Sequence, residues 1–148
     1  MPKTSFRVHT VINAAPETVF GYVADLSKHS EWAANPLQIE RISAGPIAIG
    51  SRYRSTAQVN SINFMAELQV NTYEPPTRFG FAGEDRTGRF EHQFAFRPSN
   101  MGTWLERRVN FELTLQQWLM FAALLYPVRL PAAKTALRLL KARLERGE

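Results

Sequence analysis

The chain has 148 residues, of which 45% are hydrophobic, and it carries a net charge of +5 with no cysteine. This length favours one domain, 1–148, with a core of its own, and the lack of cysteine excludes disulfides, thiolate catalysis and cysteine-based metal sites. The first thirteen residues contain no apolar signal-peptide segment, so we expect a cytoplasmic protein.

The chain opens with a predicted strand and two short helices. Residues 5–12 alternate between apolar and polar side chains, which predicts a strand whose apolar face is formed by Phe6, Val8, Thr10 and Ile12. Pro16 fits the first position of a helix, because the N–H that proline lacks is unpaired there anyway. Asp25-Leu26-Ser27 ends this helix, and Ser27 can cap a further turn that runs to Trp32.

Alternating segments between turn signals predict six further strands, at 37–44, 51–60, 63–74, 77–84, 88–97 and 103–113. The connections between them are short, which favours an antiparallel arrangement.

The stretch Leu113–Val128 is the most apolar part of the chain. It is shorter than the roughly 18 to 20 residues that a membrane-spanning helix needs, so we expect a buried or interfacial helix. Thr114 and Gln117 have the spacing of a capping box at its start. Proline removes an internal hydrogen bond, so we expect the helix to be interrupted or kinked at Pro127 and Pro131.

The two-residue period of a strand assigns the side chains that face inward. The inward set is rich in phenylalanine and contains few polar side chains. We expect this set, with apolar residues of 118–126, to line a largely apolar ligand cavity formed by Tyr53, Phe64, Leu68, Phe79, Phe81, Phe90, His92, Phe94, Leu105, Arg107, Val109, Trp118, Phe121, Ala122 and Leu125.

Two of the inward polar residues are predicted to be neighbours. A turn centred on Ser99-Asn100 would place His92 opposite Arg107, with their side chains about 5 Å apart. Either both groups point into a ligand cavity, or His92 is a satisfied core histidine and Arg107 bends to a rim. If there is catalysis, His92 and Arg107 are the candidates, with His92 as general acid or base. The three histidines have no metal-ligand spacing, and we expect neither metal nor cofactor.

The positive charge is concentrated near the C-terminus. From Leu113 onward there are six bases and two acids, whereas the first 112 residues hold twelve bases and eleven acids. The basic residues can form a solvated helix face. Alternatively, Lys134, Arg138 and Lys141 can attract anionic lipid headgroups, which would place the protein at the inner membrane surface. We expect no nucleic-acid partner.

The segment 13–32 resembles the opening of the polyketide cyclase/dehydrase and lipid-transport family, a START-like family of the SRPBCC superfamily. The matching positions are Ala15-Pro16, Val19-Phe20, Asp25-Leu26 and Trp32, followed by Gly45-Pro46, Gly50–Tyr53 and Tyr73–Pro76. The resemblance implies an α+β helix-grip fold, in which a seven-stranded antiparallel sheet curves around a long C-terminal helix. It also implies two short helices after the first strand, and a cavity for a hydrophobic ligand.

Three functions are compatible with these features. The first is a carrier or sensor of a small hydrophobic ligand, such as a lipid, isoprenoid, quinone or polyketide-like molecule. The second is an aromatic polyketide cyclase or dehydratase that uses His92 and Arg107. The third is a membrane-surface lipid-handling protein that docks through its basic C-terminal helix. We favour the first, because no other inward-facing residue completes an acid/base pair.

Overall fold

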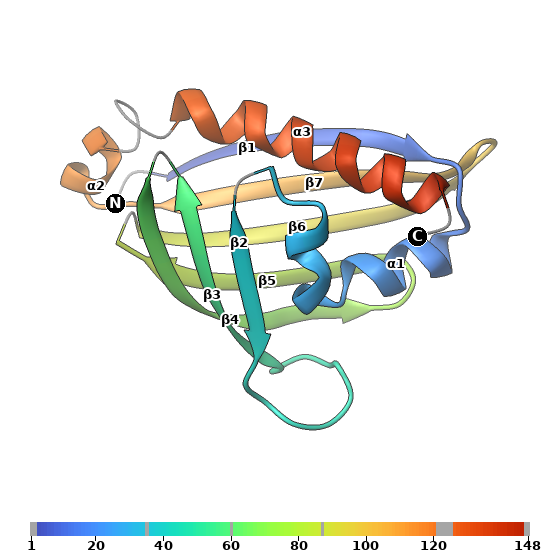
Figure 1. The fold of residues 1–148 in the computed structure, drawn as a ribbon, viewed down its shortest axis with the longest axis horizontal. Helices are drawn as coiled ribbons and strands as arrows, with labels where there is room; N and C mark the ends of the chain where they lie inside the picture. Colours follow the sequence, from blue (N-terminus) through green and yellow to red (C-terminus); the bar gives the residue numbers. More distant parts are fainter. Residues whose placement is uncertain (1–2, 35, 60, 87, 121–125, 147–148) are drawn as a thin grey trace.

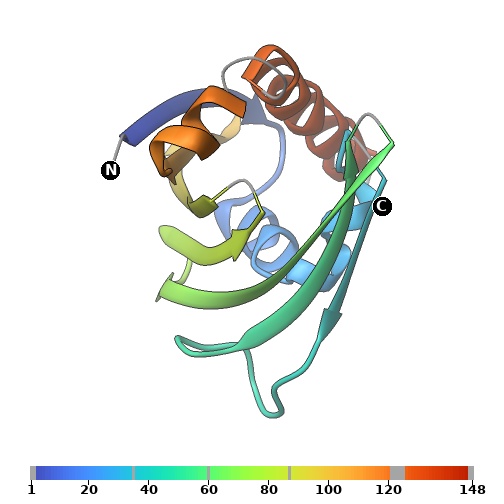
Figure 2. The same ribbon diagram turned by 90° about the vertical axis from the view of Figure 1, so that its left-hand side faces the viewer.

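A curved antiparallel sheet dominates the computed structural model, which describes residues 3–34, 36–59, 61–86, 88–120 and 126–146. Its strands are β1 (Lys3–Ile12), β2 (Leu37–Arg41), β3 (Arg52–Val59), β4 (Ile62–Glu74), β5 (Arg78–Asp85), β6 (Gly88–Ser99) and β7 (Gly102–Glu112). They lie in the order β1-β7-β6-β5-β4-β3-β2, so the first strand closes one edge beside the last. Figures 1 and 2 show the sheet wrapping around the long C-terminal helix α3. The predicted α+β fold is confirmed.

Two short helices follow β1, as predicted. Helix α1 (Pro16–Val23) has Pro16 in its first turn and buries Val19, Phe20 and Val23. The 3₁₀ helix η1 (Leu26–Glu31) follows it. Its cap is Asp25, not Ser27: the Asp25 carboxylate accepts hydrogen bonds from the Ser27 backbone N–H and hydroxyl. The carboxylate is the stronger acceptor, and it lies two residues earlier than the sequence analysis placed the cap.

The C-terminal segment forms two helices, α2 (Leu115–Met120) and α3 (Tyr126–Glu145). The predicted capping box is present, because the Gln117 backbone N–H donates to the Thr114 hydroxyl and Gln117 Oε1 accepts from the Thr114 N–H. Helix α3 begins at Tyr126, one residue before Pro127, and continues through Pro131, so the expected interruption at Pro131 is wrong. Pro127 lies in the first turn of α3, where N–H groups have no helical partner. Pro131 costs the helix one bond near its start.

The predicted inward faces are the buried ones. In β7 the odd-numbered residues from Thr103 to Phe111 are buried and the even-numbered ones are not. The expected register between β6 and β7 is wrong by two residues: His92 pairs with Val109, and Phe94 pairs with Arg107. The turn lies at Asn100-Met101, since Ser99 pairs with Gly102. Gly102 has a φ of +130° and lies too close to the Ile12 carbonyl to allow a Cβ. A shift of two preserves the face of every side chain.

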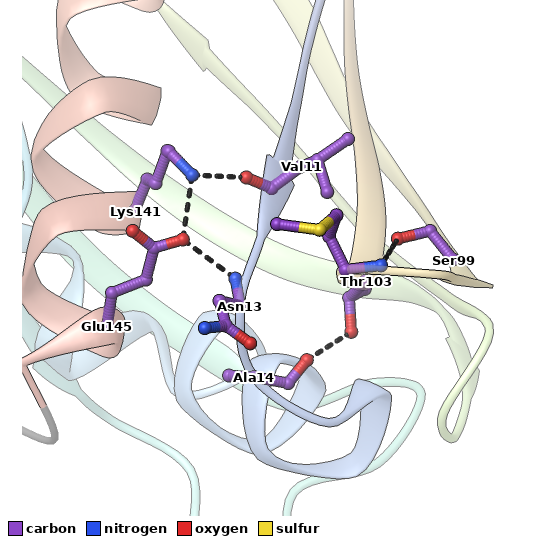
Figure 3. A network of polar contacts seen from close by, with 8 residues as sticks. Val11, Asn13, Ala14, Ser99, Thr103, Lys141 and Glu145 are labelled. Carbon is purple, nitrogen blue, oxygen red and sulfur yellow. Dashed lines mark hydrogen bonds and ion pairs between the residues drawn. The ribbon is translucent and has the colours of Figure 1, made fainter.

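Polar contacts fasten the C-terminal half of α3 to the end of β1 (Figure 3). Lys141 Nζ donates to the Val11 carbonyl and pairs with Glu145, both at 2.7 Å, and Glu145 accepts from the Asn13 N–H at 2.8 Å. The hydrogen bonds from Lys141 and Asn13 lower the pKa of Glu145. Apolar side chains of α3, from Ala133 to Leu144, join the main core beside these contacts. The helix is therefore held in place over the concave face of the sheet.

Candidate functional site

The 3₁₀ helix η1 places an unexpected histidine inside the molecule. Side chains three residues apart share one face of a 3₁₀ helix, so Leu26, His29 and Trp32 all point inward and are buried. The His29 imidazole stacks on the Trp32 indole, with ring centroids 4.1 Å apart and planes 9° apart. Burial, and then the charge of Arg107, hold the pKa of His29 well below its usual 6.5. His29 is therefore neutral at pH 7.

Arg107 provides a buried positive charge close to this stack. Only 7% of Arg107 is exposed, and its guanidinium carbon lies 5.6 Å from the centre of the Trp32 ring and 5.5 Å from that of Phe94. Aromatic faces attract cations, which compensates part of the cost of removing the guanidinium from water. Guanidinium keeps its charge at any physiological pH. The interior thus contains a permanent positive charge.

His92 contacts Arg107, although the two are diagonal rather than opposed in the sheet. Arg107 Nη2 donates to His92 Nδ1 at 2.9 Å. A guanidinium has no acceptor atom, so His92 Nδ1 is the acceptor and the proton of the neutral imidazole is on Nε2. The ring stacks on Phe81 at 4.7 Å and meets Phe90 edge-on. The predicted contact is present. The long arginine side chain spans the diagonal between the two positions.

These groups form part of the wall of a cavity of about 180 Å³ between the sheet, η1 and α3. The wall is mainly apolar, with aromatic rings from β1, β4, β5, β6 and β7 and small residues from α3. Ser55, His29, His92, Arg107 and Asp85 are its polar members. A concave apolar space with a few polar groups is the usual form of a small-molecule site.

The predicted site residues separate into three groups. Those that line the cavity are Phe64, Leu68, Phe81, Phe90, His92, Arg107 and Val109. Those that lie in the main core, away from the cavity wall, are Tyr53, Phe79, Phe94 and Leu105. Trp118 lies on α2 and is 37% exposed, and Phe121, Ala122 and Leu125 fall outside the described residues.

The part of the wall that comes from η1 and the residues after it, from β2 and from α3 was not predicted. The residues concerned are His29, Ala33, Ala34, Pro36, Leu37, Ile39, Ala132, Ala133 and Ala136. The three-residue spacing of Leu26, His29 and Trp32 is the signal that could have found His29, because it is the period of a 3₁₀ helix.

The basic residues of α3 differ in their surroundings. Lys134 and Arg138 are exposed, whereas Lys141 is half-buried and engaged with Val11 and Glu145. The exposed face that we expected from all three bases therefore consists of Lys134 and Arg138. Among the described residues, no helix is long and apolar enough to cross a membrane.

A curved antiparallel sheet wrapped around a long C-terminal helix defines the helix-grip fold. The family model described as polyketide cyclase / dehydrase and lipid transport matches residues 3–146. The chain therefore belongs to this family, as its sequence resemblance implied. No curated protein matches the chain.

Solved structures with this fold are similar in shape and distant in sequence. TTHA0849 from Thermus thermophilus has a TM-score of 0.78 and 18% identity, with 99% of each chain covered. Protein CV1439 from Chromobacterium violaceum has a TM-score of 0.73 and 16% identity, over 95% of this chain and 97% of that one. The di-domain ARO/CYC StfQ from the steffimycin biosynthetic pathway has a TM-score of 0.79 and 14% identity, over 97% of this chain and 51% of StfQ.

Proposed function

We propose that the protein binds a small hydrophobic molecule in the cavity between the sheet and α3, as a carrier or sensor. The observation that carries this proposal is the composition of the cavity wall, which combines aromatic and aliphatic side chains with a few polar groups. Apolar surface that faces water in such a space is unfavourable, and a bound apolar ligand removes that surface from water.

Mass spectrometry of the natively purified protein tests the proposal. We expect a solvent extract to contain an apolar compound in near-stoichiometric amount, and native spectra to show the matching mass increase. An unliganded protein that also fails to bind hydrophobic probes would contradict the proposal.

A cyclase or dehydratase is the alternative suggested by the family and by the fold that the chain shares with StfQ. It would require His92 and Arg107 to polarise a carbonyl and to move a proton. The carboxylate on the cavity wall, Asp85, lies four residues along β5 from Phe81, on which His92 stacks. That spacing corresponds to about 13 Å along the strand, so a shared proton transfer would need both side chains to extend toward each other. We therefore favour binding, and turnover of a bound polyketide would reverse this choice.

We also propose weak contact with an anionic membrane. Leu115, Trp118 and Leu119 form an exposed apolar patch on α2, with 68%, 37% and 57% exposed, and α2 lies near the N-terminal end of α3 (Figures 1 and 2). Exposed Lys134 and Arg138 follow on α3. Exposed apolar side chains together with exposed basic ones suit the surface of an anionic bilayer, and each base contributes about 1 kcal/mol there.

Co-sedimentation with vesicles of phosphatidylglycerol and phosphatidylcholine tests the membrane contact. Trp118→Ser with Leu119→Ser, and separately Lys134→Gln with Arg138→Gln, should each reduce binding at low salt. Lys141 is left intact in these variants because it holds α3 to β1. Equal binding by the wild type and both variants would exclude the contact.

A further inference from the structure

We propose that the ligand is a compact apolar molecule that carries one carboxylate, and that this carboxylate binds at the polar end of the cavity, formed by His29, His92 and Arg107. This inference rests on the proposed binding function and adds the chemical class of the ligand and its direction in the cavity.

His29 lies at the cavity wall with a ring nitrogen that is unpaired in the described part of the chain. Its side chain lines the cavity and is 7% exposed, and its Nδ1 atom is buried without a hydrogen-bond partner among the described residues. Leaving a buried polar atom unpaired costs about 1 to 3 kcal/mol. A ligand group that bonds to this nitrogen after a small turn of the ring recovers that energy, so His29 indicates a polar group on the ligand.

The charge near His29 is positive, because Arg107 lies in the same part of the cavity. Arg107 is close enough to His29 to contribute to the lowering of its pKa, so the positive potential of the guanidinium reaches the same part of the cavity. His92 is bonded to the same guanidinium through Nδ1. An anion is stabilised by such a set of donors, and charge-assisted hydrogen bonds are about twice as strong as neutral ones. A carboxylate therefore fits better than a neutral carbonyl or hydroxyl group.

The two sides of this polar end differ in how much free space they leave. On one side of the polar end the main core, with Phe79, Phe96 and Leu105, is closely packed. On the other side the cavity continues past Phe90 and Phe64 toward Asp85. The carboxylate thus lies deep, with the apolar body directed toward the β5–β6 turn and away from Phe79.

The size of the cavity limits the ligand. Pockets for drug-sized molecules measure about 300 to 1,000 Å³, and this cavity measures about 180 Å³. An aromatic acid of one or two rings is closer to this size than a long-chain fatty acid. The small wall residues Ala132, Ala133 and Ala136 of α3 leave room for a flat ring system beside the helix.

Isothermal titration calorimetry at about pH 7.5 with three probes tests this inference. The probes are 2-naphthoate, its neutral analogue 2-naphthamide, and palmitate. We expect 2-naphthoate to bind about tenfold or more tightly than 2-naphthamide, and palmitate to bind more weakly than 2-naphthoate. Arg107→Met should remove the preference for the anion. Thermal unfolding must show that this variant folds, because the substitution leaves His92 Nδ1 without its Arg107 donor.

Two further variants make the result specific. His29→Phe keeps the ring stacked on Trp32 and removes the nitrogen atoms, and it should weaken 2-naphthoate binding about tenfold. Arg138→Met removes the same charge from an exposed position and should change neither affinity nor preference. The wild-type comparison of the two naphthalene probes remains decisive even if Arg107→Met does not fold.

The outcomes separate this inference from the binding function itself. Equal affinity for 2-naphthoate and 2-naphthamide would overturn the carboxylate and leave the hydrophobic binding function standing. Tighter binding of palmitate than of 2-naphthoate would overturn the limit on size. If none of the three probes binds, both the inference and the binding function are contradicted.

Discussion

Filling the cavity should make the protein more stable and abolish ligand binding. Ala132 lies on the cavity wall in α3 and is half-buried, so Ala132→Leu would place three more carbon atoms in the cavity. Each buried carbon contributes about 0.8 kcal/mol, about 2.4 kcal/mol in all. The lost rotamer freedom of leucine costs about 0.5 to 1 kcal/mol, and its lower helix propensity costs little.

The expected net gain in the free energy of unfolding is about 1.5 kcal/mol. For a chain of this size, 1 kcal/mol corresponds to a rise of about 2 to 4 °C in Tm, so thermal unfolding should show a rise of roughly 3 to 6 °C. The same variant should no longer retain ligand, because the leucine side chain occupies the same space.

Ala142→Leu is the matched control, since Ala142 is on the same helix and is not on the cavity wall. It should change neither ligand retention nor Tm by a comparable amount. If Ala132→Leu lowers the Tm, or raises it and still retains ligand, the space beside α3 is not the binding cavity.

Three further predictions concern single side chains. The pKa of His29 in the folded protein is well below 6.5, so at low pH the unfolded chain takes up a proton that the folded chain does not. As the pH is lowered from about 6.5, the free energy of unfolding should therefore decrease, by up to about 1.4 kcal/mol per pH unit. Urea titrations of the wild type and His29→Gln should differ by this slope, and parallel curves would contradict it. His92→Gln should weaken ligand binding by roughly 1 to 2 kcal/mol and leave the Tm nearly unchanged; a lower Tm with unaltered affinity would make His92 a structural residue. Lys141→Met removes the ammonium group that donates to the Val11 carbonyl. It should lower the free energy of unfolding by about 1 kcal/mol without changing ligand affinity. An unchanged midpoint of chemical denaturation would refute the role given to this contact.

Strand alternation predicted most of the fold because it depends on local sequence. A strand with one buried face must alternate, so the inward residues of β7 could be assigned before its partners were known. The register of β6 against β7 depends on the turn, where Gly102 has a positive φ and lies against the carbonyl of Ile12, far earlier in the chain. Local sequence does not contain that contact.

The candidate site was largely predictable on strands β4 to β7 and was missed on η1, β2 and α3. Phe81, His92 and Arg107 follow from strand parity, and all three line the cavity. His29 lies on a six-residue 3₁₀ helix, whose three-residue period is easily overlooked in a short segment. The contribution of α3 comes from alanine residues, which give no polar signal and matter because they are small.

The central claim is that a ligand binds between the sheet and α3, and methyl-resolved NMR during a titration with 2-naphthoate tests it most directly. The account predicts large shift changes for the methyl groups of Ala57, Ala66, Val109 and Ala133, which are buried or half-buried at the cavity wall. Met65 and Leu139, which are exposed elsewhere, should not respond. Changes confined to Met65, Leu139 or other surface methyl groups would contradict the account.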